Sequence, residues 1–185
     1  QPLEFYRNNL LSLINILQCC VDAKCNNFVF SSSCSVYADP DKLPIDENAP
    51  VKTAKSPYGN TKKIGEEIIT DTVKSSLLQA VSLRYFNPVG SHDSALIGEL
   101  PTTMPLNVMP IITQVAIGKR KQFVVFGNDY PTADGSCVRD YIHVVDVAKA
   151  HVTAVKRLLN KKNNSAYEVF NLGTGKGFSV LELIH

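Results

Sequence analysis

Residues 28–33 read FVFSSS, an apolar run that passes directly into three serines. Such a run is typical of a buried strand whose carboxyl end opens into a polar loop. Upstream, residues 5–24 carry a helical stripe that predicts an amphipathic helix, formed by Leu10, Leu13, Ile14, Leu17 and Val21. Downstream, Ser56-Pro57 supplies an N-cap and a first-turn proline, so a second helix is expected over residues 57–75.

The rest of the chain continues this alternation of strand and helix. Strands are expected at residues 80–86, 123–126 and 167–171, and helices at about 109–117 and 144–159. Pro88 is expected to end the pairing of the strand before it, because proline lacks the N–H that a strand donates. The alternation predicts an α/β fold in which a parallel sheet carries helices on both faces.

Composition excludes several classes of protein. Of 185 residues, 44% are hydrophobic and 19% are charged, which is typical of a globular chain with a real core. The best apolar run, residues 10–21, is interrupted by polar residues and is shorter than the ~20 residues that span a bilayer, so no membrane association is expected. The formal net charge of +2 is too small to indicate nucleic-acid binding.

Cysteine and histidine usage points to a reducing compartment and to no metal site. The five cysteines are an odd number without a C-x-x-C pair, which favours free thiols over a disulfide framework or a zinc site. The four histidines lack a paired metal-ligand spacing. A cytoplasmic protein is therefore expected.

Both ends of the sequence indicate a fragment. Residues 179–182 read SVLE, a capping-box pattern, so a helix is expected to begin where the sequence stops. At the other end, the helix predicted over residues 5–24 has no strand before it. We therefore expect that this chain is part of a longer protein.

Tyr58 and Lys62 form a Y-x-x-x-K pair on the predicted second helix, one turn apart on one face. A tyrosine hydroxyl with a pKa near ~10 becomes a useful base only if a nearby positive charge favours the phenolate, and Lys62 could supply that charge. Taken alone, the pair is more often an ordinary surface pair, because Y-x-x-x-K occurs often by chance. Ser33 favours the catalytic interpretation, because it lies at the carboxyl end of the preceding strand, where open α/β sheets bind ligands.

Five motifs in order resemble the extended short-chain dehydrogenase/reductase family, and within it the enzymes that epimerise UDP-hexoses at C4. They are FSSS at 30–33, SPYG at 56–59, LRYFNP at 83–88, FGNDY at 126–130 and VRDYIH at 138–143. The resemblance covers nearly the whole chain. One departure is Ser35, which stands where the family commonly has threonine and keeps the hydroxyl.

The resemblance implies a partial Rossmann-like, doubly wound parallel sheet plus the start of a smaller sugar-nucleotide domain. Residues 1–98 would be the carboxyl-terminal half of the NAD-binding domain, and residues 99–185 the start of the UDP-sugar-binding domain. Within the latter, about 136–175 would return to the Rossmann sheet. The glycines at 173, 175 and 177 do not form the dinucleotide fingerprint G-x-G-x-x-G, because residue 178 is phenylalanine. That fingerprint is expected ahead of Gln1.

The resemblance also implies roles for individual residues. Tyr58 would be the catalytic base, Lys62 would set its pKa and bind the nicotinamide ribose, and Ser33 would bond the sugar 4-hydroxyl. Asn8 and Tyr85 would lie against the cofactor, NAD. Residues expected to hold the UDP-sugar are Ser33, Cys34, Ser35, Tyr85, Phe86, Asn87, Leu106, Asn107, Val108, Val124, Val125, Phe126 and Arg139. Arg139 would face the diphosphate, whereas the apolar members could equally be core residues.

The implied activity is the reversible epimerisation of UDP-galactose and UDP-glucose at C4 with bound NAD. A homodimer through the helices at 5–24 and 57–75 is expected. One alternative is a sugar-nucleotide dehydratase or decarboxylase, which typically has an acidic residue just after the position of Ser33, where this chain has Cys34 and Ser35. Another is a catalytically silent homologue that binds nucleotide for regulation, although such proteins tend to lose the base.

Overall fold

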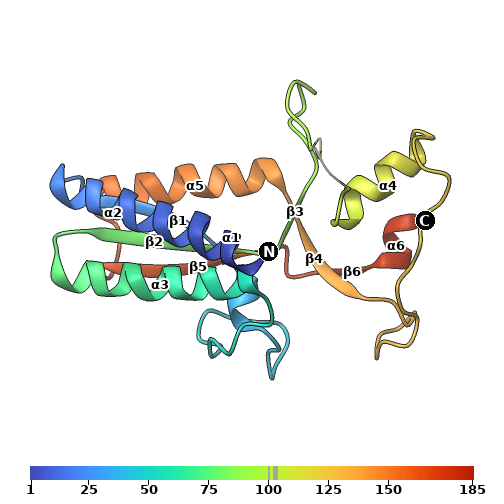
Figure 1. Ribbon diagram of the computed structural model, residues 1–185, viewed down its shortest axis with the longest axis horizontal. Coiled ribbons are helices and arrows are strands. Elements are labelled where there is room, and N and C mark those ends of the chain that lie inside the picture. Colours follow the sequence, from blue (N-terminus) through green and yellow to red (C-terminus); the bar gives the residue numbers. More distant parts are fainter. Residues whose placement is uncertain (100, 102–103) are drawn as a thin grey trace. The chain divides into compact units, whose positions relative to one another are not determined.

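The computed structural model describes residues 1–99, 101 and 104–185. The described chain forms two compact units (Figure 1). The first comprises Gln1–Phe86 and Ala148–Leu172, and the second comprises Asn87–Val147 and Gly173–His185. Both the Tyr58 and the Ser33 positions belong to the first unit.

The first unit is built on a three-stranded parallel sheet. Its strands are β1 (Asn27–Ser33), β2 (Gln79–Tyr85) and β5 (Tyr167–Leu172), in the order β1-β2-β5. Ser33 pairs with Tyr85, and Tyr85 pairs with Leu172, so all three strands end at the same edge. The expected α/β fold with a parallel sheet is confirmed.

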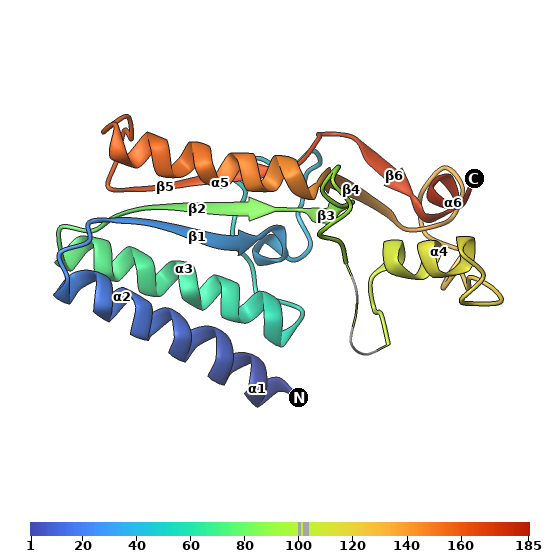
Figure 2. The same cartoon turned by 90° about the horizontal axis from the view of Figure 1, so that it is seen from above.

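Helices cover both faces of this sheet (Figure 2). On one face lie α3 (Pro57–Ser75) and a continuous helical segment made of α1 (Pro2–Tyr6), the π-helical η1 (Arg7–Leu11) and α2 (Ser12–Asp22). On the other face lies α5 (Val144–Leu159). The core between α2, α3 and the sheet contains Leu13, Leu17, Ile69, Leu78 and Ala80. The core between the sheet and α5 contains Val81, Leu83, Ala154 and Leu158.

Helix α3 begins as the sequence predicts and packs unusually close to its neighbours. The Ser56 hydroxyl accepts a hydrogen bond from the Gly59 N–H at 3.1 Å, and proline occupies the first turn. At Gly65, an added Cβ would lie 2.9 Å from the Phe30 ring and 3.1 Å from the Leu13 side chain. Glycine therefore allows α3 to approach both β1 and α2 closely.

The second unit has a small mixed sheet and two helices. Strand β3 (Asn87–Val89) pairs in parallel with β4 (Val138–His143), and β4 pairs antiparallel with β6 (Gly177–Ser179). The helices are α4 (Val108–Ala116) and α6 (Val180–Ile184). The Ser179 side chain and the Glu182 side chain form the predicted capping box at the start of α6.

Two predictions of secondary structure are wrong. Residues 123–126 do not form a strand, and the side chains of Val124 and Phe126 are 50% and 83% exposed. Pro88 does not end pairing, because β3 continues into the second sheet with Pro88 opposite Ile142. This is permitted because β3 is an edge strand, so the missing N–H of Pro88 need not serve a second neighbour.

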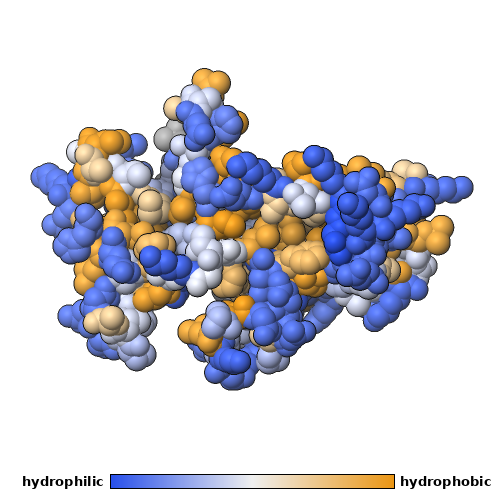
Figure 3. Space-filling model, turned by 180° about the vertical axis from the view of Figure 1, so that it is seen from behind, coloured by the Kyte–Doolittle hydropathy of each residue, from blue (hydrophilic) through white to orange (hydrophobic). Residues whose placement is uncertain are grey.

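The surface carries exposed hydrophobic side chains among charged ones, as Figure 3 shows for the face that bears α5. On α5 itself the exposed apolar residues are Val144, Val152, Val155 and Leu159. Within the described residues, no helix has the length and apolar character required to cross a bilayer.

Candidate active site

Ser33 lies at the point where β1 turns into a short 3₁₀-helix, η2 (Cys34–Tyr37). Its side-chain oxygen caps that helix by accepting hydrogen bonds from the Ser35 backbone N–H at 3.2 Å and from the Ser35 hydroxyl at 3.0 Å. Ser33 is only 7% exposed. The predicted substrate-binding residues Ser33, Cys34 and Ser35 therefore form one compact turn at the carboxyl edge of the sheet.

Tyr58, in the first turn of α3, reaches this turn. A hydrogen bond joins its side chain to that of Ser33, and its ring packs edge-on against Phe5 with the centroids 6.3 Å apart. Burial raises the pKa of Tyr58 above its usual value, the neighbouring Tyr85 and Cys34 raise it further, and the hydrogen bond with Ser33 lowers it. Ser33 thus stabilises the ionised form that a tyrosine base requires.

Lys62 lies one turn after Tyr58 on the same face of α3. Its Nζ is 5.5 Å from the centroid of the Tyr58 ring and 5.1 Å from that of Phe30, and it donates a 2.8 Å hydrogen bond to the Ser31 carbonyl. Burial lowers the pKa of Lys62. The ammonium group is therefore held between β1 and α3, close to the phenol ring.

Tyr85 ends β2 directly beside Ser33 in the sheet register. Its ring lies 6.3 Å from the imidazole of His151, centroid to centroid, and His151 Nε2 shares a 2.9 Å hydrogen bond with the Ser31 hydroxyl. A side chain of α5 thus packs next to the Tyr85 ring. The structure brings together the sequence-predicted Ser33, Tyr58, Lys62 and Tyr85.

Asn8 belongs to the helical segment that precedes α2. It lies in the π-helical turn η1 and is exposed, whereas its neighbour Asn9 donates a 2.9 Å hydrogen bond to the Thr61 hydroxyl on α3. Tyr6, just before η1, accepts a hydrogen bond from Asn60 at 2.9 Å. The π-helical turn is therefore fastened to α3 next to Tyr58, and π-helical turns are frequent at functional sites.

The remaining predicted sugar-nucleotide residues belong to the second unit, apart from Phe86, which ends the main stretch of the first unit and is half-buried. Asn87 donates a 2.9 Å hydrogen bond to the Asp140 carbonyl. Asn107 precedes α4 without capping it through its side chain, and Leu106 is 95% exposed. Arg139 is exposed on β4 and bonds the Val138 carbonyl at 2.9 Å. Val108 and Val125 are half-buried, and Val124 and Phe126 are exposed.

Sequence reasoning missed a buried polar cluster beneath the site. The guanidinium of Arg84 binds the Glu66 carboxylate through two hydrogen bonds of 2.8 and 2.5 Å, and it donates a third, of 2.8 Å, to the Tyr37 hydroxyl. Burial lowers the pKa of Arg84, but its hydrogen bonds to Glu66 and Tyr37 outweigh burial and raise it. Two features of the sequence could have indicated this cluster. Arg84 is part of the LRYFNP motif, and Glu66 follows Lys62 by one helical turn.

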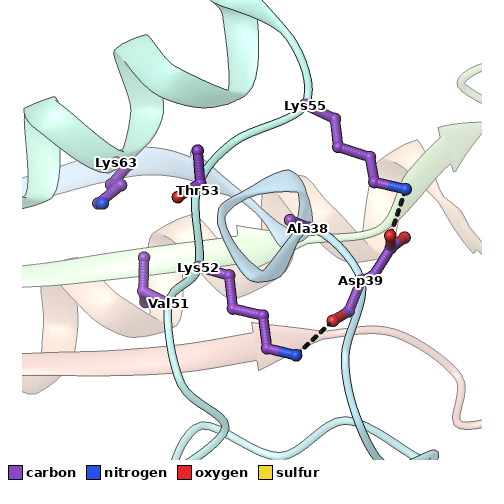
Figure 4. A pocket seen from close by; sticks show the side chains of 7 residues that line it. All are labelled: Ala38, Asp39, Val51, Lys52, Thr53, Lys55 and Lys63. Carbon is purple, nitrogen blue, oxygen red and sulfur yellow. Dashed lines mark hydrogen bonds and ion pairs between the residues drawn. The ribbon is translucent and has the colours of Figure 1, made fainter.

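A separate hollow of about 540 Å³ lies next to η2 (Figure 4). Its lining residues are Ala38, Asp39, Val51, Lys52, Thr53, Lys55 and Lys63. Lys52 donates a 2.8 Å hydrogen bond to the Asp39 carbonyl, and Lys55 pairs with the Asp39 carboxylate. The hollow contains none of the predicted site residues, and each of its three lysines lies within 4.0 Å of a carboxylate: Lys52 of Asp41, Lys55 of Asp39 and Lys63 of Glu67. The strand-end cluster is therefore the candidate active site.

The donor groups at this edge suit a dinucleotide and a sugar. Ligands of open α/β sheets bind beyond the carboxyl ends of the strands, which is where Ser33 and Tyr85 lie. In the described part of the chain, Lys62 uses one of its three N–H donors on the Ser31 carbonyl, which leaves two for ribose hydroxyls. Tyr58 and Ser33 offer hydroxyls that can exchange a proton with a sugar hydroxyl. These residues fit NAD and a hexose.

Comparison with known proteins decides the family. The profile of the NAD dependent epimerase/dehydratase family matches residues 1–173. The chain belongs to this family. The resemblance predicted from the five motifs is thereby confirmed, together with the Rossmann-like fold class.

Members of the NAD dependent epimerase/dehydratase family with assigned names are similar along the full chain. The chain is 48% identical to the UDP-glucose 4-epimerases of Haemophilus influenzae and of Homo sapiens over 185 residues, which is 100% of this chain but 54% and 52% of those proteins. It therefore spans about half the length of the curated relatives that it matches.

Solved structures of UDP-glucose 4-epimerases are similar to this chain in sequence and in fold. A UDP-glucose 4-epimerase from Stenotrophomonas maltophila with bound NAD and formylated UDP-arabinopyranose is 48% identical, with a TM-score of 0.93 over 99% of this chain and 54% of that one. A UDP-glucose 4-epimerase from Bifidobacterium longum in complex with NAD⁺ and UDP is 44% identical, with a TM-score of 0.90 and the same coverage.

Proposed function

We propose that the protein carrying this chain interconverts UDP-galactose and UDP-glucose by epimerisation at C4 with bound NAD. The observation that carries the proposal is the hydrogen-bonded pair of Ser33 and Tyr58 at the carboxyl edge of the sheet, with Lys62 one turn away. The names and ligands of the similar proteins support it, since they are UDP-glucose 4-epimerases solved with NAD and UDP compounds.

In this mechanism the protein's own residues manage the proton. Tyr58, as phenolate, takes the proton of the sugar 4-hydroxyl, while Ser33 holds that hydroxyl in line with the phenol oxygen. Bound NAD would supply the reversible hydride chemistry at C4, so that the reaction would involve no net redox change. Tyr58 then gives the proton back to the C4 oxygen. Lys62 binds the nicotinamide ribose and favours the phenolate by its charge.

The structure favours epimerisation over elimination of water. A dehydratase needs an acid near the sugar, and the residues after Ser33 are Cys34 and Ser35. The buried carboxylate beneath the site, that of Glu66, already accepts two hydrogen bonds from Arg84 and one of 2.5 Å from the Ser32 hydroxyl. A carboxylate bound in this way is not available to donate a proton to a leaving hydroxyl.

The remaining substrate and cofactor contacts are part of the same proposal. Asn8 and Tyr85 would border NAD, and the residues of the second unit from Asn87 to Arg139 would hold the UDP moiety. The proposed domains are residues 1–98, the carboxyl-terminal half of the NAD-binding domain, and residues 99–185, the start of the UDP-sugar-binding domain, with about 136–175 returning to the Rossmann sheet. The first compact unit is consistent with this assignment in outline, since residues 148–172 join residues 1–86 in it, although its main stretch ends at Phe86 and not at residue 98.

The test is a full-length protein incubated with UDP-galactose. We expect a transient rise in near-ultraviolet absorbance from reduced nicotinamide and conversion to UDP-glucose, reaching the same equilibrium from either sugar. A 4-keto-6-deoxy product would identify a dehydratase instead. Absence of both absorbance change and product, with NAD bound, would indicate a catalytically silent homologue.

We further propose a homodimer formed through the helices at 5–24 and 57–75. Along α1, η1 and α2, six large apolar residues are more than 40% exposed, which suits a covered surface: Leu3, Phe5, Leu11, Ile14, Ile16 and Val21. Light scattering of the full-length protein should give twice the monomer mass, and a monomer mass would contradict the pairing. We also propose a cytoplasmic location, supported by five cysteines that form no disulfide among the described residues, which a fractionation experiment can test.

A further inference from the structure

One buried carboxylate, that of Glu66, is bonded to every element that carries a candidate catalytic side chain. It accepts 2.8 and 2.5 Å hydrogen bonds from Arg84 on β2 and a 2.5 Å hydrogen bond from Ser32 on β1, and it belongs to α3 itself. The side chains of Arg84 and Glu66 are 6% and 9% exposed. The ion pair is thus closed off from water and fully engaged.

The cluster continues from Arg84 into the turn that contains Ser33. Arg84 donates a 2.8 Å hydrogen bond to the hydroxyl of Tyr37, the last residue of η2, and that hydroxyl donates one of 2.7 Å to Asn171 on β5. Tyr37 is fully buried. The short helix η2 is therefore fixed at both ends, by the Ser33 cap at its start and by Tyr37 at its end.

The cluster residues are neighbours of the candidate catalytic residues in the same strands and in the same helix. Ser32 directly precedes Ser33 in β1, and Arg84 directly precedes Tyr85 in β2. Ser32 and Arg84 lie opposite each other in the sheet register. Successive residues of a strand point to opposite sides, so a side chain locked beneath the sheet edge fixes the direction of the next one. On α3, Glu66 lies two turns after Tyr58 on the same face.

We propose that Glu66, Arg84 and Tyr37 are positioning residues that align the Ser33 hydroxyl with Tyr58. The inference rests on the proposed function, because it assigns to this cluster the geometry of the proton-transfer pair. The side chains of all three members are buried. They act through Ser32, Tyr85 and η2.

A role confined to stability is a weaker explanation for a pair of this kind. Burying two charges costs so much hydration that a buried ion pair commonly adds little net stability over apolar residues of similar volume. The chain contains a second pair with the same two-point geometry, Arg157 with Glu168, at 2.7 and 2.9 Å. It joins α5 to the beginning of β5, far along the sheet from the strand ends. This second pair provides a matched control.

The proposal predicts a specific change in the pH dependence of the reaction. The groups that face Tyr58 are Lys62 on its own helix, Tyr85 on β2, and Ser33 and Cys34 at the start of η2. Tyr85 and Cys34 raise the pKa of Tyr58, and the hydrogen bond with Ser33 lowers it. Loss of the Ser33 alignment therefore raises the pKa, and the acidic limb of the rate profile moves to higher pH.

The experiment compares Tyr37→Phe and Glu66→Gln with the control Glu168→Gln in the full-length protein loaded with NAD. Both glutamate side chains are 9% exposed and each binds its arginine at two points, so both Gln variants weaken a two-point ion pair. The arginine that stays behind is 6% exposed for Glu66→Gln and 29% exposed for Glu168→Gln, so Tyr37→Phe is the variant with the smaller structural change. For Tyr37→Phe and Glu66→Gln we expect a shift of the acidic limb by about 0.5 to 1 pH unit, the worth of one hydrogen bond. Below the limb kcat should fall about 3- to 10-fold, with KM for the UDP-sugar nearly unchanged. The control should keep the wild-type profile.

A wild-type position of the limb in both cluster variants, or an equal shift in Glu168→Gln, would overturn the inference. Tyr37→Phe covers the case in which Glu66→Gln does not fold, because it removes one hydroxyl and keeps the ring. Failure of the proposed function is recognised separately, as a wild type without turnover. In that case a tyrosinate absorbance titration, with Tyr58→Phe as the reference, reports the pKa of Tyr58 directly. In Tyr37→Phe this titration must show a pKa of Tyr58 higher than in the wild type, again by about 0.5 to 1 pH unit.

Discussion

Replacing Tyr58 by phenylalanine separates the chemical role of its hydroxyl from the packing role of its ring. The phenylalanine ring can keep the edge-on contact with Phe5 and the position beneath the Lys62 ammonium. The hydrogen bond to Ser33 is lost, but Ser33 retains its two bonds from Ser35. The substitution therefore removes one polar contact and leaves the fold otherwise satisfied.

For Tyr58→Phe, the expected loss of stability and the expected loss of turnover differ enough to be distinguished. Loss of one hydrogen bond whose partner stays bonded should change the free energy of unfolding by about 1 kcal/mol or less. Loss of a positioned base should lower kcat by about 10² to 10⁴, which corresponds to about 3 to 5 kcal/mol of transition-state stabilisation. The catalytic effect should thus exceed the structural one several-fold.

The assay measures turnover of UDP-galactose, affinity for the UDP-sugar by calorimetry, and thermal unfolding of the full-length protein. The control is Tyr167→Phe, which also removes a buried hydroxyl, one that shares a 2.7 Å hydrogen bond with Ser82 within the sheet. The control should retain turnover. If Tyr58→Phe binds the sugar normally and turns it over at near the wild-type rate, Tyr58 is not the base.

Three further substitutions test the site and the core. Lys62→Met should raise the pKa of Tyr58 by deleting a nearby positive charge, so activity should recover partly at higher pH, and a pH–rate profile of wild-type position would contradict this. Leu158→Ala, at a residue 2% exposed between the sheet and α5, should reduce the free energy of unfolding by about 2 to 5 kcal/mol in urea titrations. The hydrogen bond from Arg157 lowers the pKa of Glu168 below its ordinary value of 4.5, so the pair contributes stability above that pH, and this contribution disappears as pH falls through the lower folded value. Glu168→Gln should therefore flatten the pH dependence of unfolding below about pH 4.5, and a dependence as steep as that of the wild type would refute the linkage.

Local sequence signals predict the first unit well because its elements are determined locally. The Ser56-Pro57 start of α3 and the apolar stripe of α2 depend only on residues within the same helix. Strand β2 is a continuous buried run, as expected for the central strand of a parallel sheet. The joint position of Ser33 and Tyr85 then follows, since parallel strands end at the same edge.

The second unit is harder to predict because its strands depend on distant partners. Strands β3 and β6 are three residues each, too short to show a period of two. The run at 123–126 has the composition of a strand, but no described strand pairs with it, and Phe126 remains exposed. Composition indicates that a segment can pair, whereas the partner is decided by the rest of the fold.

The Glu66 cluster shows where sequence reasoning can be extended. Tyr58, Lys62 and Glu66 are spaced four residues apart, so they lie along one face of α3 and descend from the sheet edge toward its interior. Glu66, the last of the three, is buried beneath Tyr58 and Lys62. A buried carboxylate requires a partner of opposite charge. Arg84 is the cation on the neighbouring strand one residue before the strand end. The spacing in the helix and the position in the strand together predict the ion pair, which neither segment predicts alone.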